Sequence, residues 1–218
     1  MCISKEVSLV AFFTSLATSV YLFQRNNQND RWAALTFGYI GFMQILEVMM
    51  WIDQKCSGLN QKATSLAFWH NVLQPVVSLG VAYYFTKGKI SSYLYLILAA
   101  YLLYSLPKIY NAKKENQCSL PCKGSTVGLS WPYTYTDNYL SNQIVWIVFA
   151  IALASPFLAM KKDKYIYFSL VLITFMMGHF ISTKRCPEDE LNKSNPTSGS
   201  WWCLIGAFAP LVSVYINK

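Results

Sequence analysis

The long apolar segments of this chain contain very few ionisable residues, and these are the first candidates for chemistry. Glu47, His70 and His179 lie inside apolar stretches, and Asp53 follows the second of them. An ionisable side chain is costly to bury in a membrane, so each one is a candidate functional residue. Two imidazoles and a carboxylate form a recurrent ligand set of catalytic zinc. One hypothesis is therefore a membrane-embedded, metal-dependent hydrolase that uses Glu47, His70 and His179.

Neutral polar residues accompany these groups at helical spacing. Gln44 and Glu47 share a helix face, as do His70 and Gln74. This spacing predicts an outward-facing polar pocket with eight candidate residues: Gln44, Glu47, Asp53, His70, Asn71, Gln74, Gln143 and His179. Alternatively, the same groups bond between helices and only hold them together. Because the chain has no HExxH pattern, we favour a non-enzymatic protein that binds a small ligand or ion without a metal or other cofactor.

The elements that must position these residues are apolar segments of membrane-spanning length. Hydrophobic residues make up 54% of the chain and charged residues only 13%, and a spanning helix needs about 20 apolar residues. We predict an all-α integral membrane bundle, a single domain over residues 1–218, in which Pro75, Pro156 and Pro210 kink their helices. Seven transmembrane helices are expected, of which the first and last are the shortest, at residues 7–23, 32–52, 63–86, 90–106, 144–160, 165–183 and 201–216.

The basic residues indicate how the helices are oriented. Short connections at 25–31, 87–89 and 161–164, with Lys218, are rich in Lys and Arg and fall on one side of a seven-helix chain. The positive-inside rule therefore predicts an external or luminal N-terminus and a cytosolic C-terminus. The net charge of +8 forms no continuous basic stripe, so we expect the lipid bilayer as partner and no nucleic acid.

All six cysteines fall on the opposite, external side or at its membrane boundary. Disulfides persist in oxidising compartments, so we predict a disulfide-stabilised outer face. The pairing is left open among Cys56, Cys118, Cys122, Cys186 and Cys203, with Cys2 also on this side. A zinc site at Cys118 and Cys122 is the alternative, which lacks histidines at zinc-finger spacing.

Aromatic residues and one long connection complete the prediction. Four tryptophans at predicted helix ends are expected to be interfacial anchors: Trp32, Trp51, Trp201 and Trp202. The connection at 108–142 is rich in Cys, Pro, Gly and aromatic residues, and this composition indicates an ordered lid.

One part of the chain resembles a known group of proteins. The stretches RWAALTFGYIGFMQILEVMMWID and FWHNVLQP, which contain Glu47 and Gln74, are similar to uncharacterised multi-pass membrane proteins encoded by giant DNA viruses. The resemblance covers the second and third predicted helices. It implies a multi-pass protein of a viral or host membrane, with a purely structural role as a further possibility, and no assigned activity.

Overall fold

The computed structural model describes residues 4–25, 27–112, 118–121, 129–130, 139–185 and 198–216. Apart from two strands of two residues each, Leu120–Pro121 (β1) and Leu129–Ser130 (β2), its elements are helices, as predicted. They are α1 (Lys5–Gln24), α2 (Gln28–Ile52), α3 (Leu59–Phe85), α4 (Ser92–Ala112), α5 (Tyr139–Ala154), the 3-10 helix η2 (Ser155–Ala159), α6 (Lys164–Arg185), α7 (Ser198–Ala207) and α8 (Ala209–Ile216).

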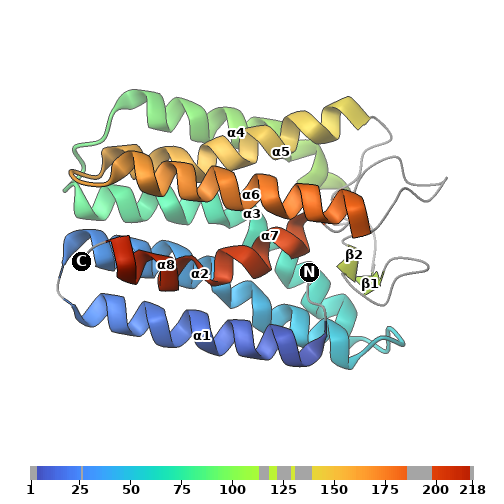
Figure 1. Cartoon of the computed structure of the whole chain (residues 1–218). Coiled ribbons are helices and arrows are strands. Elements are labelled where there is room, and N and C mark those ends of the chain that lie inside the picture. Colours follow the sequence, from blue (N-terminus) through green and yellow to red (C-terminus); the bar gives the residue numbers. More distant parts are fainter. Residues whose placement is uncertain are drawn as a thin grey trace.

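The helices lie lengthwise in one bundle and alternate in direction, with α7 and α8 following one another along the same line (Figure 1). The end of α1 and the start of α2, the turns at 86–91 and 160–163, and the end of α8 lie at one end. The start of α1, the turn at 53–58 and the two strands lie at the other end. Each predicted apolar segment therefore coincides with one helix or one pair of consecutive helices.

Three of the described helical segments are long and apolar enough to cross a membrane: Lys5–Gln24, Gln28–Ile52 and Lys164–Ile181. The first helix starts earlier than the apolar pattern indicates because Ser4 caps it, its hydroxyl accepting from the N–H of Val7 at 3.3 Å. Large apolar side chains are also exposed on the bundle surface, such as Val10 (61%), Leu96 (69%) and Met176 (69%). Such a surface is typical of a protein that contacts lipid.

Two of the three prolines expected to perturb helices coincide with breaks. The helical path changes to a 3-10 turn at Pro156, and α7 ends just before Pro210, because proline has no N–H to donate to the preceding turn. Helix α3 continues through Pro75. The Tyr101 hydroxyl of α4 donates to the carbonyl of Val72 at 3.2 Å, within the turn that Pro75 perturbs.

Aromatic rings fill the core and correct one prediction. Trp32 of α2, Phe157 of η2 and Tyr167 of α6 are fully buried, with ring centroids of neighbours 5.6 to 6.4 Å apart. Trp202 is 2% exposed and Trp201 is 8% exposed. The prediction that Trp32, Trp201 and Trp202 anchor the protein at an interface is therefore wrong, because their faces turn toward neighbouring helices. Trp51 is partly buried against the same core.

Side chains at the start of α2 tie one end of the bundle together. The Gln28 amide donates to the Phe85 carbonyl of α3 at 2.9 Å, and the Asn29 amide donates to the Lys162 carbonyl at 3.2 Å. Arg25 donates to the Val214 carbonyl of α8 at 3.2 Å. These three side chains, which lie where α1 ends and α2 begins, thus satisfy carbonyl groups at the ends of three other segments.

Helices α1 and α2 approach each other closely through small residues. Gly38 and Gly41 of α2 face Ser19 and Ser15 of α1. A Cβ atom on Gly38 would lie 2.9 Å from the Ser19 hydroxyl, and one on Gly41 would overlap the Ser15 side chain. Small residues that allow such contact are typical of helix pairs in membranes.

We expect Gly41→Ala to destabilise the protein by about 1–3 kcal/mol through overpacking against Ser15. The matched control is Gly80→Ala in α3, where an added Cβ meets open space within 4 Å. This control should be neutral or should stabilise by up to about 1 kcal/mol through helix propensity. Thermal unfolding in detergent measures both, and equal midpoints for the two variants would contradict close α1–α2 packing.

Candidate functional site

The structure buries most of the predicted pocket residues in the interior of the bundle. Gln44 and Glu47 of α2 are 0% exposed, and Gln74 of α3 is 1% exposed. His70 is also buried, whereas Asn71 of α3 and His179 of α6 are half-buried. The side chain of Gln143 lies outside the described residues. Gln44 and Glu47, and His70 and Gln74, were each expected to share a helix face lining an outward-facing pocket, and all four side chains are buried.

His70 is held by Tyr39 of the neighbouring helix α2. The His70 and Tyr39 rings stack with centroids 4.2 Å apart and planes at 11°. His70 Nε2 lies 2.8 Å from the Tyr39 carbonyl oxygen, which can only accept, so Nε2 carries a proton. The Tyr39 hydroxyl in turn donates to the His70 carbonyl at 3.4 Å. These mutual contacts fix the imidazole in place and occupy its Nε2.

The second nitrogen of His70 begins a short polar chain across the bundle. His70 Nδ1 lies 3.4 Å from Gln74 Nε2, which also donates to Asn71 Oδ1 at 2.9 Å. The Cys203 thiol of α7 contacts the same Asn71 oxygen at 3.9 Å, and the Glu47 carboxylate interacts electrostatically with Cys203. We call these groups the interior polar cluster: Tyr39, Glu47, His70, Asn71, Gln74 and Cys203.

One hydrogen-bond acceptor in the cluster has no donor among the described residues. Gln74 Oε1 is buried and has no hydrogen-bond partner among the residues that the structure describes. A buried amide oxygen without a partner is unfavourable by about 1–3 kcal/mol. The cluster therefore has the capacity to accept one further donor or a cation.

The structure does not support the metal-site hypothesis for Glu47, His70 and His179. Within the described part of the chain, no three His, Cys, Asp or Glu side chains are grouped so that they could hold a metal ion. His70 already uses Nε2 on a carbonyl group, and His179 lies on α6. The convergence of three helices that this hypothesis requires is therefore not found among the described residues.

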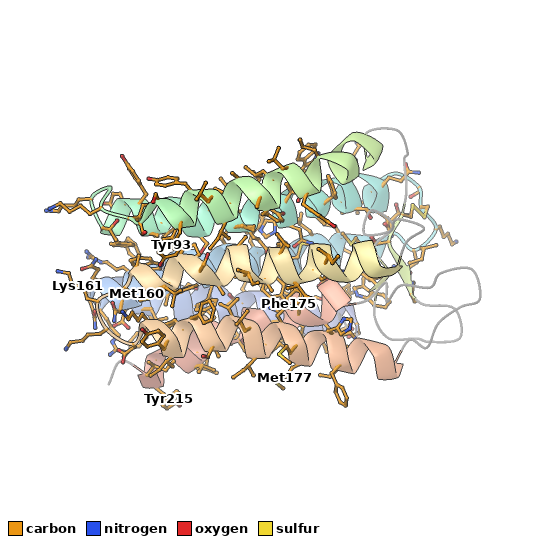
Figure 2. The ribbon with its side chains drawn as sticks, turned by 90° about the horizontal axis from the view of Figure 1, so that it is seen from above. Tyr93, Met160, Lys161, Phe175, Met177 and Tyr215 are labelled. Carbon is orange, nitrogen blue, oxygen red and sulfur yellow. A yellow bond between two sulfur atoms is a disulfide. The ribbon has the colours of Figure 1, made fainter. Side chains whose placement is uncertain are left out.

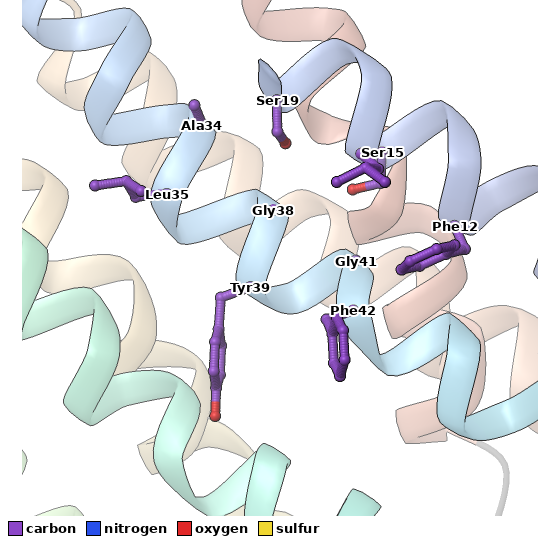
Figure 3. A pocket seen from close by; sticks show the side chains of 10 residues that line it. Phe12, Ser15, Ser19, Ala34, Leu35, Gly38, Tyr39, Gly41 and Phe42 are labelled. Atoms are coloured by element: carbon purple, nitrogen blue, oxygen red, sulfur yellow. The ribbon is translucent and has the colours of Figure 1, made fainter. Parts of the chain in front are cut away.

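A separate groove of about 230 Å³ lies between α1 and α2 (Figure 3). It opens on the bundle surface beside Leu16, Leu35 and Phe42, which are 47%, 41% and 51% exposed. Ten residues line it: Phe12, Ser15, Leu16, Ser19, Ala34, Leu35, Gly38, Tyr39, Gly41 and Phe42. None is a predicted pocket residue. Tyr39 nevertheless belongs to both the groove and the interior polar cluster, so the groove adjoins His70.

Asp53, another pocket candidate, caps a helix. Gly58 precedes α3 and has no side chain to satisfy the first N–H groups of that helix. One Asp53 oxygen accepts from the Asn60 N–H at 3.0 Å, and the other accepts from the Ser57 N–H at 2.9 Å and hydroxyl at 2.8 Å. A carboxylate at a helix N-terminus is favourable. Asp53 therefore joins the end of α2 to the start of α3.

Next to this cap, a buried amide binds the start of the long connection. Asn60 Oδ1 accepts from the Ser119 N–H at 2.9 Å, and Asn60 Nδ2 donates to the Ser119 carbonyl at 2.9 Å and to the Met50 carbonyl at 3.1 Å. Thr64 donates to the Ser119 hydroxyl at 3.0 Å. Both Asn60 and Ser119 are 0% exposed, so their polar groups form hydrogen bonds with protein groups in place of water.

A disulfide between Cys56 and Cys118 closes the same junction, with Cα atoms 6.1 Å apart. The prediction that these cysteines form a disulfide is confirmed, and the pairing, which the sequence left open, fixes residues 118–121 on the α2–α3 turn. The alternative zinc site is not supported, because Cys118 is bonded to Cys56. Cys203 is a free, buried thiol, so its prediction as a disulfide candidate is wrong. Cys122 and Cys186, with most of the predicted lid, lie outside the described residues.

Several structurally important residues carry no clear signal in the sequence. Tyr39 acts through its ring and backbone carbonyl, which no motif marks. Asn60 and Ser119 are distant in sequence and meet only in the fold. Asp30 is fully buried and forms an ion pair with Arg25 at 3.2 Å. Its sequence signal is an acidic residue in the first turn of a helix that follows a basic connection.

The Asp53 cap gives a dependence of stability on pH. The backbone N–H groups of Asn60 and Ser57 lower the pKa of Asp53 to about 2, against the opposing effect of burial. The unfolded pKa is about 3.9. Because the folded pKa is depressed, the stabilisation is fully present above about pH 4 and is lost as the pH falls towards about 2.

We therefore expect the melting temperature of the protein to fall between about pH 4 and pH 2, and Asp53→Asn to reduce this fall. Asp163→Asn, at the opposite end of the bundle, is the matched control. Thermal unfolding followed by tryptophan fluorescence across this pH range provides the measurement. If Asp53→Asn has the same pH profile as the wild type, the cap does not contribute to stability.

No family model, curated protein or solved structure matches this chain. Function is therefore inferred from the chemistry of the residues themselves.

Proposed function

We propose that this chain is a multi-pass membrane protein that binds a small cation at its interior polar cluster. The position of Glu47 carries the proposal: this carboxylate is 0% exposed in α2, one of the helices long enough to span a membrane. It lies close enough to act electrostatically on Cys203, whose thiol is 3.9 Å from the Asn71 amide oxygen. Ionisable groups at such positions commonly mark ion or substrate sites.

The chemistry of the cluster favours a cation over an anion. Carboxylate and amide oxygens are hard ligands that suit alkali and alkaline-earth cations. Gln74 Oε1, which lacks a hydrogen-bond partner within the described residues, is available as one such ligand. His70 is engaged by Tyr39, so its role in this proposal is to position Gln74.

We further infer that the N-terminus is external or luminal and the C-terminus cytosolic, with all seven apolar segments in the bilayer. The basic turns and the Cys56–Cys118 disulfide lie at opposite ends of the bundle. Basic residues favour the cytosolic side, and disulfides favour the oxidising side. The resemblance to giant-virus proteins suggests a host or virion membrane.

A structural role is the second candidate. The His70–Tyr39 and Gln74–Asn71 hydrogen bonds are completed within the protein, as expected of polar contacts that hold membrane helices together. The response of the protein to cations separates this role from ion binding.

For topology, we expect a membrane-impermeant maleimide to label Lys62→Cys from outside intact cells and Lys87→Cys only after permeabilisation. Both lysines are exposed and lie toward opposite ends of the bundle. Cys2, Cys122 and Cys186 are replaced by serine in both variants, and Cys203 is retained because its thiol is buried. Labelling of Lys87→Cys in intact cells would overturn the proposed orientation.

For binding, we expect Na⁺, K⁺ or Ca²⁺ to raise the melting temperature of the detergent-solubilised protein relative to choline. A cation at ten times its Kd stabilises by about 1.4 kcal/mol, which corresponds to about 3–6 °C for a chain of this size. Glu47→Gln, which keeps hydrogen-bonding capacity but removes the charge, should abolish this shift. Asp53→Asn, the matched control, should retain it.

If Glu47→Gln does not fold, Gln74→Leu provides the test, because it removes the available oxygen at similar volume. Loss of the cation response in Gln74→Leu supports the ion site. A wild-type protein that responds to none of the cations, or a Glu47→Gln protein with an unchanged response, would favour the structural role.

A further inference from the structure

One end of the bundle gathers basic side chains from three separate turns. We call it the basic end, and it comprises Arg25, Arg31, Lys87, Lys89, Lys161, Lys162 and Lys164. The hydrogen bonds from Gln28 to Phe85 and from Asn29 to Lys162 hold these turns together. Figure 2 shows Lys161 projecting from this end. Residues distant in sequence thus form one charged surface.

Little negative charge balances this surface. The described carboxylates at the basic end are Asp30 and Asp163. Asp30 is fully buried and is paired with Arg25 at 3.2 Å, so it is not available to the other cations. The second ion pair found in the described chain joins Lys5 and Glu6 at the opposite end. Lys87, Lys89, Lys161 and Lys162 are exposed, and none of them forms an ion pair with a described carboxylate.

Exposed tyrosines surround the basic end. Tyr84 is 72%, Tyr165 67% and Tyr215 66% exposed, each within the first or last turn of its helix. Lys164 lies 5.0 Å from the Tyr165 ring centroid, and Arg25 lies 5.9 Å from the Tyr21 centroid. Tyrosines at helix ends favour the boundary between lipid and water. The adjacent basic groups therefore lie at the depth of lipid headgroups.

We propose that the basic end binds the headgroups of anionic phospholipids in the adjoining leaflet. This inference rests on the proposed membrane-spanning arrangement. Several lysines and arginines at the end of membrane helices attract anionic lipid, and here the nearby carboxylates do not neutralise them. The tyrosines favour lipid over a nucleic acid or an acidic protein, because neither of these partners needs aromatic groups at headgroup depth.

The test uses the full-length protein in neutral detergent and short-chain phospholipids as probes. Binding of dioctanoyl phosphatidylserine, dioctanoyl phosphatidylinositol phosphate and dioctanoyl phosphatidylcholine is followed by tryptophan fluorescence. We expect both anionic lipids to bind more tightly than phosphatidylcholine and to lose affinity as salt is added. The triple variant Lys87→Gln, Lys89→Gln, Lys161→Gln should weaken their binding by about tenfold or more.

The matched control is Lys5→Gln, Lys55→Gln, Lys62→Gln, which removes three exposed lysines elsewhere and should bind as the wild type does. Equal loss of binding in the two triple variants, or equal affinity for all three lipids, would overturn the proposal. Tighter binding of an RNA oligonucleotide or polyglutamate than of either anionic lipid would overturn it as well.

Inorganic phosphate and inositol phosphate, added as competitors of lipid binding, show which part of the headgroup the protein recognises. Competition by both compounds indicates that the protein recognises the phosphate group alone. Competition by inositol phosphate alone indicates that it recognises the whole headgroup, and either result supports the proposal. Alkaline extraction of native membranes separately tests the proposed function. A chain that resists extraction but shows no lipid preference refutes the lipid proposal alone, whereas an extracted chain refutes membrane spanning.

Discussion

The constraint on which the rest of this structure depends is that a polar group inside an apolar bundle is unfavourable unless it finds a partner within the protein. Its clearest example is Asn60, fully buried at the start of α3, whose amide bonds both backbone groups of Ser119 and the carbonyl of Met50. A single side chain thereby fixes three segments. The Cys56–Cys118 disulfide then makes the same attachment covalent.

The same constraint organises the opposite end of the bundle. Gln28, Asn29 and Arg25 donate to carbonyl groups at the ends of other segments, which have no following helical turn to satisfy them. Asp30 is buried because Arg25 accompanies it. The side chains that form these hydrogen bonds are therefore different from the exposed lysines at this end. The lysines remain available to bind a partner.

Between the two ends, packing and polar chemistry meet at Tyr39. Gly38 and Gly41 allow α1 to approach one face of α2, and the Tyr39 ring extends from α2 to stack on His70 of α3. His70 then orients Gln74, whose carbonyl oxygen has no partner among the described residues. Close packing of α1 is thus linked through one aromatic side chain to the geometry around the candidate ion site.

The sequence by itself determined the helices, because apolar runs and prolines act locally. Each predicted segment coincides with one helix or with a pair of consecutive helices, and the two pairs are interrupted near Pro156 and Pro210. Glu47 and Gln74, which the sequence marks as polar residues within apolar segments, are buried in the bundle. Only the tertiary structure decided that Cys118 pairs with Cys56, that Cys203 is free, that Trp32 and Trp202 face the core, and that His70 bonds the Tyr39 carbonyl. These outcomes depend on the rotation and depth of each helix relative to its neighbours, which are set by contacts between residues far apart in the chain.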